Sequence, residues 1–164
     1  MIRFSIAAAL LAIAAPVGAA EPPRGIEDDH YWLPVKVDRD AGVAFFLSWT
    51  DRAGDAVQFH MLAVYRDVQR HRDIGSRGME YDKEIFRFLG DCGSRMLLRT
   101  GYRYQKSNEA IPVLVSPVQT ASVPLKDSGK DFALAAACRN DQGRIDFIKE
   151  PYAWAKQQLG QAGQ

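Results

Sequence analysis

Few residues of this 164-residue chain belong to the types that usually carry reactive chemistry. It has two cysteines and three histidines, and neither type stands in a recognisable metal or haem spacing. The motifs HExxH, CxxCH and paired CxxC are absent, which removes the common zinc and c-type haem signatures. The phosphate-binding patterns GxGxxG and GxxxxGK[ST] and the nucleophile pattern GxSxG are absent too. We therefore predict a protein that is not an enzyme and that has no dedicated metal site.

The chain also lacks a large excess of positive or negative charge. The formal net charge is +1, and Arg3 is the only charged residue among the first twenty. The rest of the chain therefore carries 20 basic and 20 acidic side chains. This balance provides no general attraction to nucleic acid or to anionic lipid. Beyond the first twenty residues, no apolar run approaches the length of a membrane span, so we expect neither kind of partner.

The first twenty residues have the pattern of a secretory signal peptide. Arg3 precedes an apolar run over residues 4–15, Pro16 breaks it, and small residues lead to Ala20. This run is too short to span a membrane as a helix. No cysteine stands at the cleavage site, so we expect an exported protein, periplasmic or at the cell surface, without a lipid anchor. Residues 21–30 are polar and proline-rich, which predicts a flexible arm.

Cys92 and Cys138 are the two cysteines. In an oxidising compartment an isolated pair most often forms one disulfide. The alternative, a redox or metal-binding pair, lacks a CxxC spacing and a nearby histidine. We therefore predict a structural disulfide between Cys92 and Cys138.

Hydrophobic alternation predicts a series of strands at hairpin spacing. The strand segments are residues 31–37, 43–49, 56–65, 83–92, 95–104 and 113–115. Alternation over 56–65 places five apolar or aromatic side chains on one face, namely Val57, Phe59, Met61, Ala63 and Tyr65. Between these strands no helical crossover is expected, which favours an antiparallel meander.

The last third of the chain predicts two helices. Ser128, with Asp131 three residues later, resembles a capping box before a strongly helix-forming run. Pro151 fits the first turn of a short second helix over residues 152–159, which Gly160 ends. The predicted fold class is α+β. A single antiparallel sheet of about five or six strands has one face covered by the Ser128 helix, which the disulfide pins to the side of Phe86 and Phe88.

An arginine-rich interruption over residues 67–78 is the strongest local charge feature. One interpretation is a docking loop for an acidic partner or an anionic group, and the other is a solvated loop balanced by Asp67 and Asp73. The candidate docking residues are Arg66, Arg70, His71, Arg72 and Arg77.

Two further groups have competing interpretations. The run Asp82-Lys83-Glu84 offers two carboxylates, of Asp82 and Glu84, for acid–base chemistry. We expect it instead to be the exposed start of a strand. His60, on a strand, is either a haem ligand or a histidine of structural role.

Several segments, taken in order, carry a resemblance to a known family. They are Tyr31-Trp32, the run Arg52–Asp55 before a strand ending at Tyr65, the segment Tyr81–Cys92, and the segment Asp131–Cys138. Over residues 31–138 the chain resembles the surface-adhesin protein E family of Gram-negative bacteria. The resemblance implies an antiparallel sheet backed by a helix and one disulfide. For the best-known members it also implies binding of host vitronectin, laminin and haemin.

The expected function is that of an exported, non-catalytic binding protein. Its partner would be an extracellular-matrix protein or another envelope protein, docked on the uncovered sheet face or the arginine-rich loop. The alternatives are a periplasmic haem or small-ligand binding protein, with His60 and His71 as candidate haem ligands, and an envelope protein of structural role. The expected organisation is a signal peptide (1–20), an arm (21–30), an adhesin-like domain (31–139) and a C-terminal extension (140–164).

Overall fold

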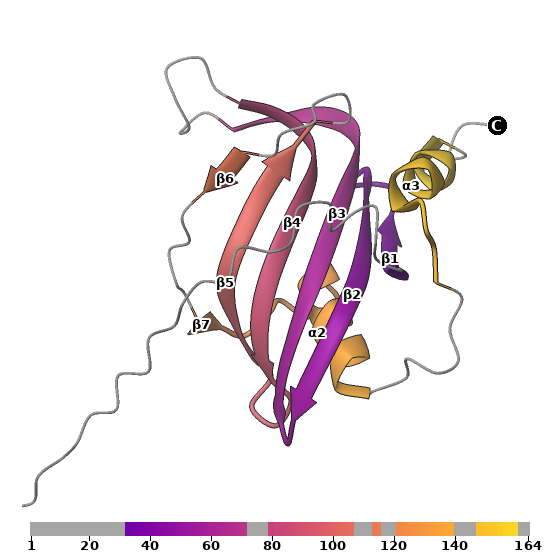
Figure 1. The fold of residues 1–164 in the computed structure, drawn as a ribbon. Helices are drawn as coiled ribbons and strands as arrows, with labels where there is room; N and C mark the ends of the chain where they lie inside the picture. The colour runs from indigo at the N-terminus through magenta and orange to yellow at the C-terminus, as the bar shows by residue number, and fades with distance from the viewer. Residues whose placement is uncertain (1–31, 72–78, 107–112, 116–120, 140–146, 161–164) are drawn as a thin grey trace, which may run out of the picture.

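The computed structural model describes residues 32–71, 79–106, 113–115, 121–139 and 147–160. These residues form seven strands and two helices (Figure 1). The strands are β1 (Leu33–Asp38), β2 (Val43–Ala53), β3 (Ala56–His71), β4 (Met79–Asp91), β5 (Met96–Gln105), β6 (Val113–Val115) and β7 (Ala121–Ser122). The helices are α2 (Gly129–Arg139) and α3 (Pro151–Gly160). The predicted signal peptide and arm lie outside the described residues.

The strands form one antiparallel sheet in the order β1-β2-β3-β4-β5-β6. The predicted meander is therefore confirmed, but the sheet has seven strands instead of five or six. The seventh, β7, pairs with β5 through Leu97 and Leu98 beyond the main path. A strand of two residues is too short to show alternation of apolar and polar side chains, so the sequence does not indicate it. It pairs with β5 because the tertiary fold brings the two segments together.

The turns between the early strands are tight. Gly54 has a φ of +63° in the β2–β3 turn, a backbone conformation that glycine adopts without the strain of a side chain. The β2–β3 hairpin that it closes pairs from Val43 opposite Tyr65 to Ala53 opposite Ala56.

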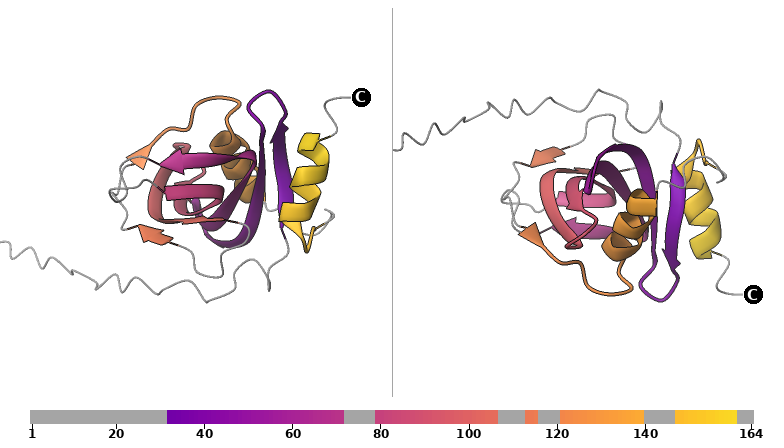
Figure 2. Two further views of the ribbon diagram at one scale, coloured as in Figure 1. Left: turned by 90° about the horizontal axis from the view of Figure 1, so that it is seen from above. Right: turned by 90° about the horizontal axis from the view of Figure 1, so that it is seen from below.

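The sheet is curved, and the two helices lie on opposite sides of its β1–β2 part (Figure 2). We call the face that packs against α2 the concave face. Its core combines apolar residues of β1 to β5 with Ala133, Leu134, Ala136 and Ala137 of α2. Val57, Phe59, Met61 and Ala63, predicted to share a face, all belong to this core, and Tyr65 packs against it.

The opposite, convex face packs against α3. Its core contains residues of the sheet with Ala155 and Leu159 of the helix, and Trp32 is fully buried there. The edge of Trp154 meets the ring of Phe46, with 5.5 Å between the ring centroids. Trp32 also forms an isolated antiparallel bridge with Ile148, which ties the segment before α3 to the sheet. The described part of the C-terminal extension is thus packed on the sheet.

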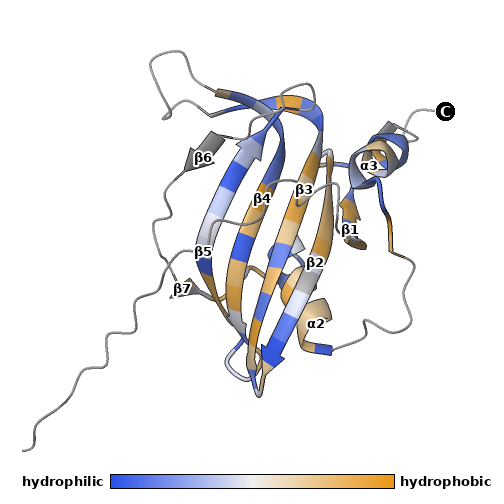
Figure 3. Cartoon of the chain, viewed as in Figure 1, coloured by the Kyte–Doolittle hydropathy of each residue, from blue (hydrophilic) through white to orange (hydrophobic). Residues whose placement is uncertain are grey.

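The middle of strand β3 is buried on both faces because it lies between the two helices. Met61 and Ala63 face the concave core, whereas Leu62 and Val64 face the convex core. An unbroken hydrophobic run is typical of a strand with both faces covered, and this part of β3 is coloured as hydrophobic in Figure 3. Burial of each large side chain stabilises the fold by about 1.5–3 kcal/mol.

The predicted disulfide is confirmed. Cys92 and Cys138 are bonded, with 5.7 Å between their Cα atoms. Cys92 directly follows β4, and Cys138 lies in the last turn of α2. Phe86, Phe88 and Cys92 belong to the same concave-face cluster as Leu134, Ala137 and Cys138. The bond therefore links the end of β4 to the helix that packs on this face.

Candidate functional site

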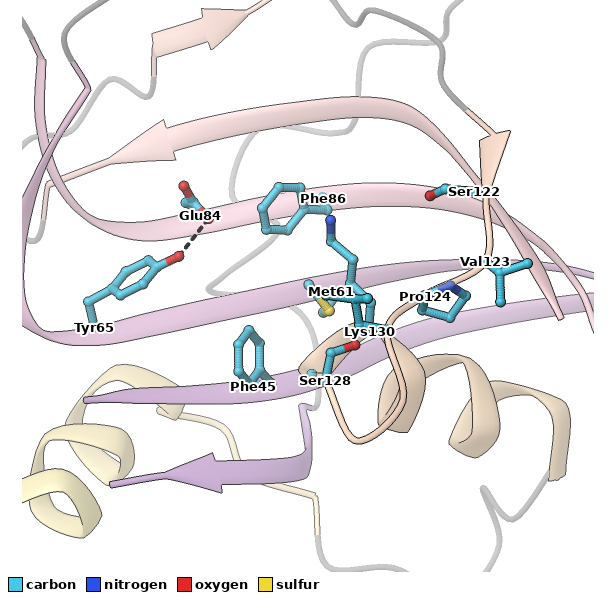
Figure 4. A pocket seen from close by; sticks show the side chains of 12 residues that line it. Phe45, Met61, Tyr65, Glu84, Phe86, Ser122, Val123, Pro124, Ser128 and Lys130 are labelled. Carbon is cyan, nitrogen blue, oxygen red and sulfur yellow. Dashed lines mark hydrogen bonds between the residues drawn. The ribbon is translucent and has the colours of Figure 1, made fainter. Parts of the chain in front are cut away.

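A pocket of about 410 Å³ opens on the concave face, beside the start of α2 (Figure 4). Strands β2, β3 and β4 form its floor, and the segment from β7 to α2 forms its rim. Its lining residues are Phe45, Met61, Tyr65, Glu84, Phe86, Ser122, Val123, Pro124, Leu125, Ser128, Gly129 and Lys130. Pockets of this size are typical of small-molecule sites. This lining combines apolar side chains with the polar groups of Tyr65, Glu84, Ser122, Ser128 and Lys130.

The register of the sheet determines which side chains meet in this pocket. Phe45 of β2 pairs with Ala63 of β3, Ala63 pairs with Glu84 of β4, and Glu84 pairs with Tyr104 of β5. The short side chain of Ala63 thus stands between a phenyl ring and a carboxylate. Side chains two residues apart on a strand share a face, so Glu84 projects beside Phe86 into the concave side.

The Glu84 carboxylate is surrounded by tyrosines. The Tyr65 hydroxyl donates a hydrogen bond of 2.7 Å to Glu84 Oε2, which Figure 4 shows as a dashed line. Tyr81 also hydrogen-bonds Glu84. The ring of Tyr81 lies 4.6 Å from the ring of Tyr104, centroid to centroid, and 5.9 Å from that of Tyr65. A half-buried aromatic cluster therefore holds one carboxylate at the end of the pocket.

The electrostatics of this cluster follow from burial and from the charge of Glu84. Burial raises the pKa of Tyr65 well above its ordinary value of 10.0, and the negative charge of Glu84 raises it further. The same two causes, in the same order, raise the pKa of Tyr81 and the pKa of Tyr104. These three phenols therefore stay protonated over the physiological pH range and remain hydrogen-bond donors.

The other wall of the pocket is the start of α2. Ser128 precedes the helix, and its Oγ accepts a hydrogen bond of 3.2 Å from the backbone N–H of Asp131. Asp131 in turn accepts from the backbone N–H of Asp127 at 3.1 Å. The predicted cap is thus present, with the return bond going to Asp127. This cap sets the direction in which Lys130, in the first turn, leaves the helix.

Lys130 brings a positive charge to the pocket. Its Nζ lies 5.9 Å from the centroid of the Phe86 ring, within the range of a cation–π contact. Figure 4 shows the side chain rising from the helix toward that ring. Among the described residues no carboxylate lies within ion-pairing distance of this ammonium group.

The expectation that Asp82, Lys83 and Glu84 are exposed was wrong. Their side chains are buried, with relative exposures of 2%, 6% and 9%. Asp82 accepts a hydrogen bond of 2.9 Å from the hydroxyl of Tyr152 in α3. Lys83 Nζ lies 5.3 Å from the centroid of the same tyrosine ring. Strand β4 begins four residues earlier than predicted, at Met79, which moves these residues from a strand end into the body of the sheet.

The first part of the arginine-rich segment, residues 67–71, belongs to strand β3. Because β3 continues to His71 and β4 begins at Met79, the predicted loop over residues 67–78 is shorter than expected. Arg70 pairs opposite Glu80, and their side chains form an ion pair of 3.0 Å. Arg66 donates to Asp67 Oδ2 at 3.2 Å. We call residues 65–71 and 79–82 the β3–β4 hairpin, in which residues 69–71 pair with residues 79–81.

The remaining candidate residues have separate positions. Arg72, Arg77 and the side chain of His71 lie outside the described part of the structure, so their role as docking residues stays a prediction. His60 is buried on the convex face, between Ser48 and Arg87 in the sheet register. It therefore faces away from the concave pocket.

The pocket residues Tyr65, Glu84 and Lys130 were missed as a site by sequence reasoning. Alternation already placed Tyr65 on the face of Met61, and it places Glu84 on the face of Phe86. That signal was available, but the approach of Lys130 depends on how α2 packs.

No group of three or more His, Cys, Asp or Glu side chains is arranged to hold a metal ion in the described ranges. Neither α2 nor α3, the helices that the described residues form, has the length and apolar composition needed for a membrane crossing.

The chain was compared with known proteins. No protein-family model matches the sequence, and no curated protein matches it. Two solved structures of protein E from Haemophilus influenzae are similar to it. The first is 11% identical with a TM-score of 0.48, and covers 77% of this chain and 96% of that chain. The second, from a non-typeable strain, is 8% identical with a TM-score of 0.43, and covers 76% and 88%.

Residues 31–138 resemble the protein E family in sequence, and the two structural neighbours are also protein E. At these identities and TM-scores no contact residue or partner is transferred to this chain.

Proposed function

We propose that this chain is an exported, non-catalytic binding protein of the surface-adhesin type. The apolar segment at residues 1–20 supports export, as does the single disulfide, since such bonds persist in oxidising compartments. The absence of nucleophile and metal motifs supports a role in binding instead of catalysis. The family resemblance supports an extracellular-matrix protein as the partner.

The β3–β4 hairpin is the observation that carries this proposal. Its Arg66 and Arg70 side chains are 42% and 63% exposed. Val68, between them, is 52% exposed. An exposed apolar side chain flanked by guanidinium groups suits an acidic protein surface, because arginine provides charge, hydrogen bonds and stacking area together.

A binding assay on immobilised vitronectin and laminin tests the hairpin. The double variant Arg66→Ala, Arg70→Ala should bind at least tenfold more weakly than the unchanged chain. Arg52→Ala is the control for loss of a distant arginine, because Arg52 of β2 pairs with Val57 near the opposite end of β3. It removes one positive charge, whereas the double variant removes two. Equal binding by the double variant and the unchanged chain would remove the hairpin from the proposal.

Cell fractionation tests the location. An adhesin must reach the outer surface, so protease added to intact cells should degrade the protein. Protection from protease in intact cells, with loss of protection once the outer membrane is opened, would leave a periplasmic protein and rule out adhesion.

The concave pocket favours a second candidate function, the binding of a small ligand. It combines an apolar floor of Met61 and Phe86 with the polar groups of Tyr65, Glu84 and Lys130, and a small number of placed polar groups is what orients a ligand in such sites. Haemin is one probe of this function, and its Soret band reports binding directly. A spectral shift lost in His60→Ala would assign haem to the convex face instead, because His60 lies there.

A further inference from the structure

Two side chains of opposite charge line the concave pocket. Glu84 brings a carboxylate from β4, inside the sheet, and Lys130 brings an ammonium group from the first turn of α2. The two residues come from elements that are far apart in the sequence. Figure 4 shows the Glu84 carboxylate beside Tyr65 at one end, and the Lys130 side chain extended toward Phe86. The pocket therefore has a negative end and a positive wall.

The surfaces between these charges are apolar. Phe86 and Met61, paired across β3 and β4, form the floor, and Phe45 closes one side. On the rim, Val123 and Leu125 are 61% and 82% exposed. Large apolar side chains with that much exposure gain from contact with an apolar body that covers them. These surfaces suit a ligand with an apolar body.

We propose that the concave pocket binds a small zwitterionic molecule with an apolar body, with its ammonium group at Glu84 and its carboxylate at Lys130. An apolar amino acid or a short apolar peptide has this chemistry. The inference rests on the small-ligand function proposed above and names the ligand class for that pocket.

A ligand of a single charge fits less well. An organic anion would pair with Lys130 but would bring its charge close to the buried carboxylate of Glu84. An organic cation would meet Glu84 but would be repelled by Lys130. Like charges at short range disfavour binding. A molecule that carries both charges satisfies both walls at once.

The aromatic surroundings support the ammonium end at Glu84. Tyr65 and Tyr81 both hydrogen-bond the carboxylate, so their rings lie near it, and ammonium groups are attracted to aromatic rings. The hydroxyl of Tyr65, kept protonated by burial, holds the carboxylate in place through the 2.7 Å hydrogen bond. The acceptor is therefore oriented before a ligand arrives, which reduces the entropy lost on binding.

Calorimetric titration of the full, disulfide-bonded chain with four probes tests this inference. L-phenylalanine and L-alanyl-L-phenylalanine carry both charges, 2-phenylethylamine lacks the carboxylate, and 3-phenylpropanoate lacks the ammonium group. We expect at least one of the two zwitterions to bind about tenfold more tightly than either single-charge probe, as expected for the loss of one charge-assisted contact. Ligand-induced shifts of the Met61 methyl resonance, assigned with Met61→Leu, should locate the bound molecule in the pocket.

Two variants separate the ends of the pocket. Lys130→Gln should weaken the zwitterion about tenfold and leave 2-phenylethylamine unweakened. Glu84→Gln keeps the shape of the side chain and should weaken both. Lys126→Gln removes an exposed cation four residues before Lys130, outside the lining, and should change neither affinity. Lys130 is exposed, so Lys130→Gln should fold. This variant therefore tests the proposed carboxylate contact even if Glu84→Gln does not fold.

Three results would overturn the inference: no binding of any probe, equal affinity for the zwitterions and one single-charge probe, or an unchanged zwitterion affinity in Lys130→Gln. If these probes fail while haemin binds and His60→Ala keeps the Soret shift, the ligand class is wrong and the small-ligand function of the pocket stands. If haemin fails as well, both are wrong, and the hairpin proposal keeps its own separate test.

Discussion

The ammonium nitrogen of Lys156 in α3 lies 2.7 Å from the carbonyl oxygen of Tyr65 in β3. The same nitrogen lies 2.7 Å from the carbonyl oxygen of Arg66. At this point the β3–β4 register jumps, from Val64 opposite Lys83 to Gln69 opposite Tyr81. Backbone groups at such a bulge lose their regular partners across the sheet, and a lysine from a distant helix supplies hydrogen bonds there.

Lys156→Met tests the value of this contact. The methionine keeps much of the apolar stem but removes both charge-assisted hydrogen bonds, so we expect the free energy of unfolding to fall by about 1.5–3 kcal/mol. Urea denaturation measures it. Gln157→Met, on an exposed position of the same helix, is the control and should change the free energy by less than about 0.5 kcal/mol. Equal midpoints for the two variants would show that the contact contributes nothing.

Reduction of the disulfide should lower the stability of the fold by a large amount. It joins residues that are 46 positions apart, and the chain-entropy relation assigns a loop of that length an upper contribution of about 4 kcal/mol. The double variant Cys92→Ala, Cys138→Ala should therefore unfold at a clearly lower urea concentration. A reducing agent should shift the unchanged chain in the same direction and leave the variant where it is. A reducing agent that shifts both equally would contradict this account.

Gly129→Ala tests the close packing of α2 on β2. A Cβ atom at Gly129 would stand 2.5 Å from the Phe45 ring, so the ring or the helix must move. We expect a loss of about 1–3 kcal/mol, the usual cost of overpacking. In Gly160→Ala the new atom meets nothing within 4 Å, so the substitution should be neutral or slightly stabilising. Thermal unfolding of the pair distinguishes steric conflict from a general effect of replacing glycine.

We expect the tyrosine cluster to make the folded chain less stable at high pH. Burial and the charge of Glu84 raise the pKa of Tyr65, Tyr81 and Tyr104 in the folded chain. Above about pH 10, the ordinary value, the unfolded chain releases these protons while the folded chain retains them. The unfolded state is then favoured, so the contribution present below pH 10 is lost as the pH rises.

Urea midpoints from pH 8 to pH 11 measure this effect, and absorbance near 295 nm reports tyrosine ionisation. The fall in stability with pH should be smaller in Tyr65→Phe, which lacks one of the shifted groups. A phenylalanine variant with the same pH dependence as the unchanged chain would show that Tyr65 does not contribute.

Strand boundaries were predictable where alternation was strong. The segment 113–115 was predicted as a strand and is β6, and the helix after Ser128 is α2. Strand β3 was predicted to end at Tyr65, but it continues to His71. Charged residues such as Arg66 and Arg70 are typical of loops. In a hairpin with exposed side chains, however, no buried face imposes alternation, and cross-strand pairs such as Arg70–Glu80 sustain the strand.

The burial of Asp82 shows what local pattern cannot reveal. Its partner, the hydroxyl of Tyr152, is 70 residues away and approaches only because α3 packs on the convex face. The same reason applies to Lys130 in the pocket, because a helix cap sets the direction of the helix but not the strand on which it lies.

The amino-acid sequence alone determined the antiparallel meander, the α2 helix and the pairing of Cys92 with Cys138. These follow from the period of apolar residues, from local capping and from there being only two cysteines. Tertiary packing decided that α2 and α3 lie on opposite sides of the sheet, that Asp82–Glu84 are buried, and that Glu84 and Lys130 line one pocket. Contacts between distant segments depend on the shapes of both partners, which neither segment encodes by itself.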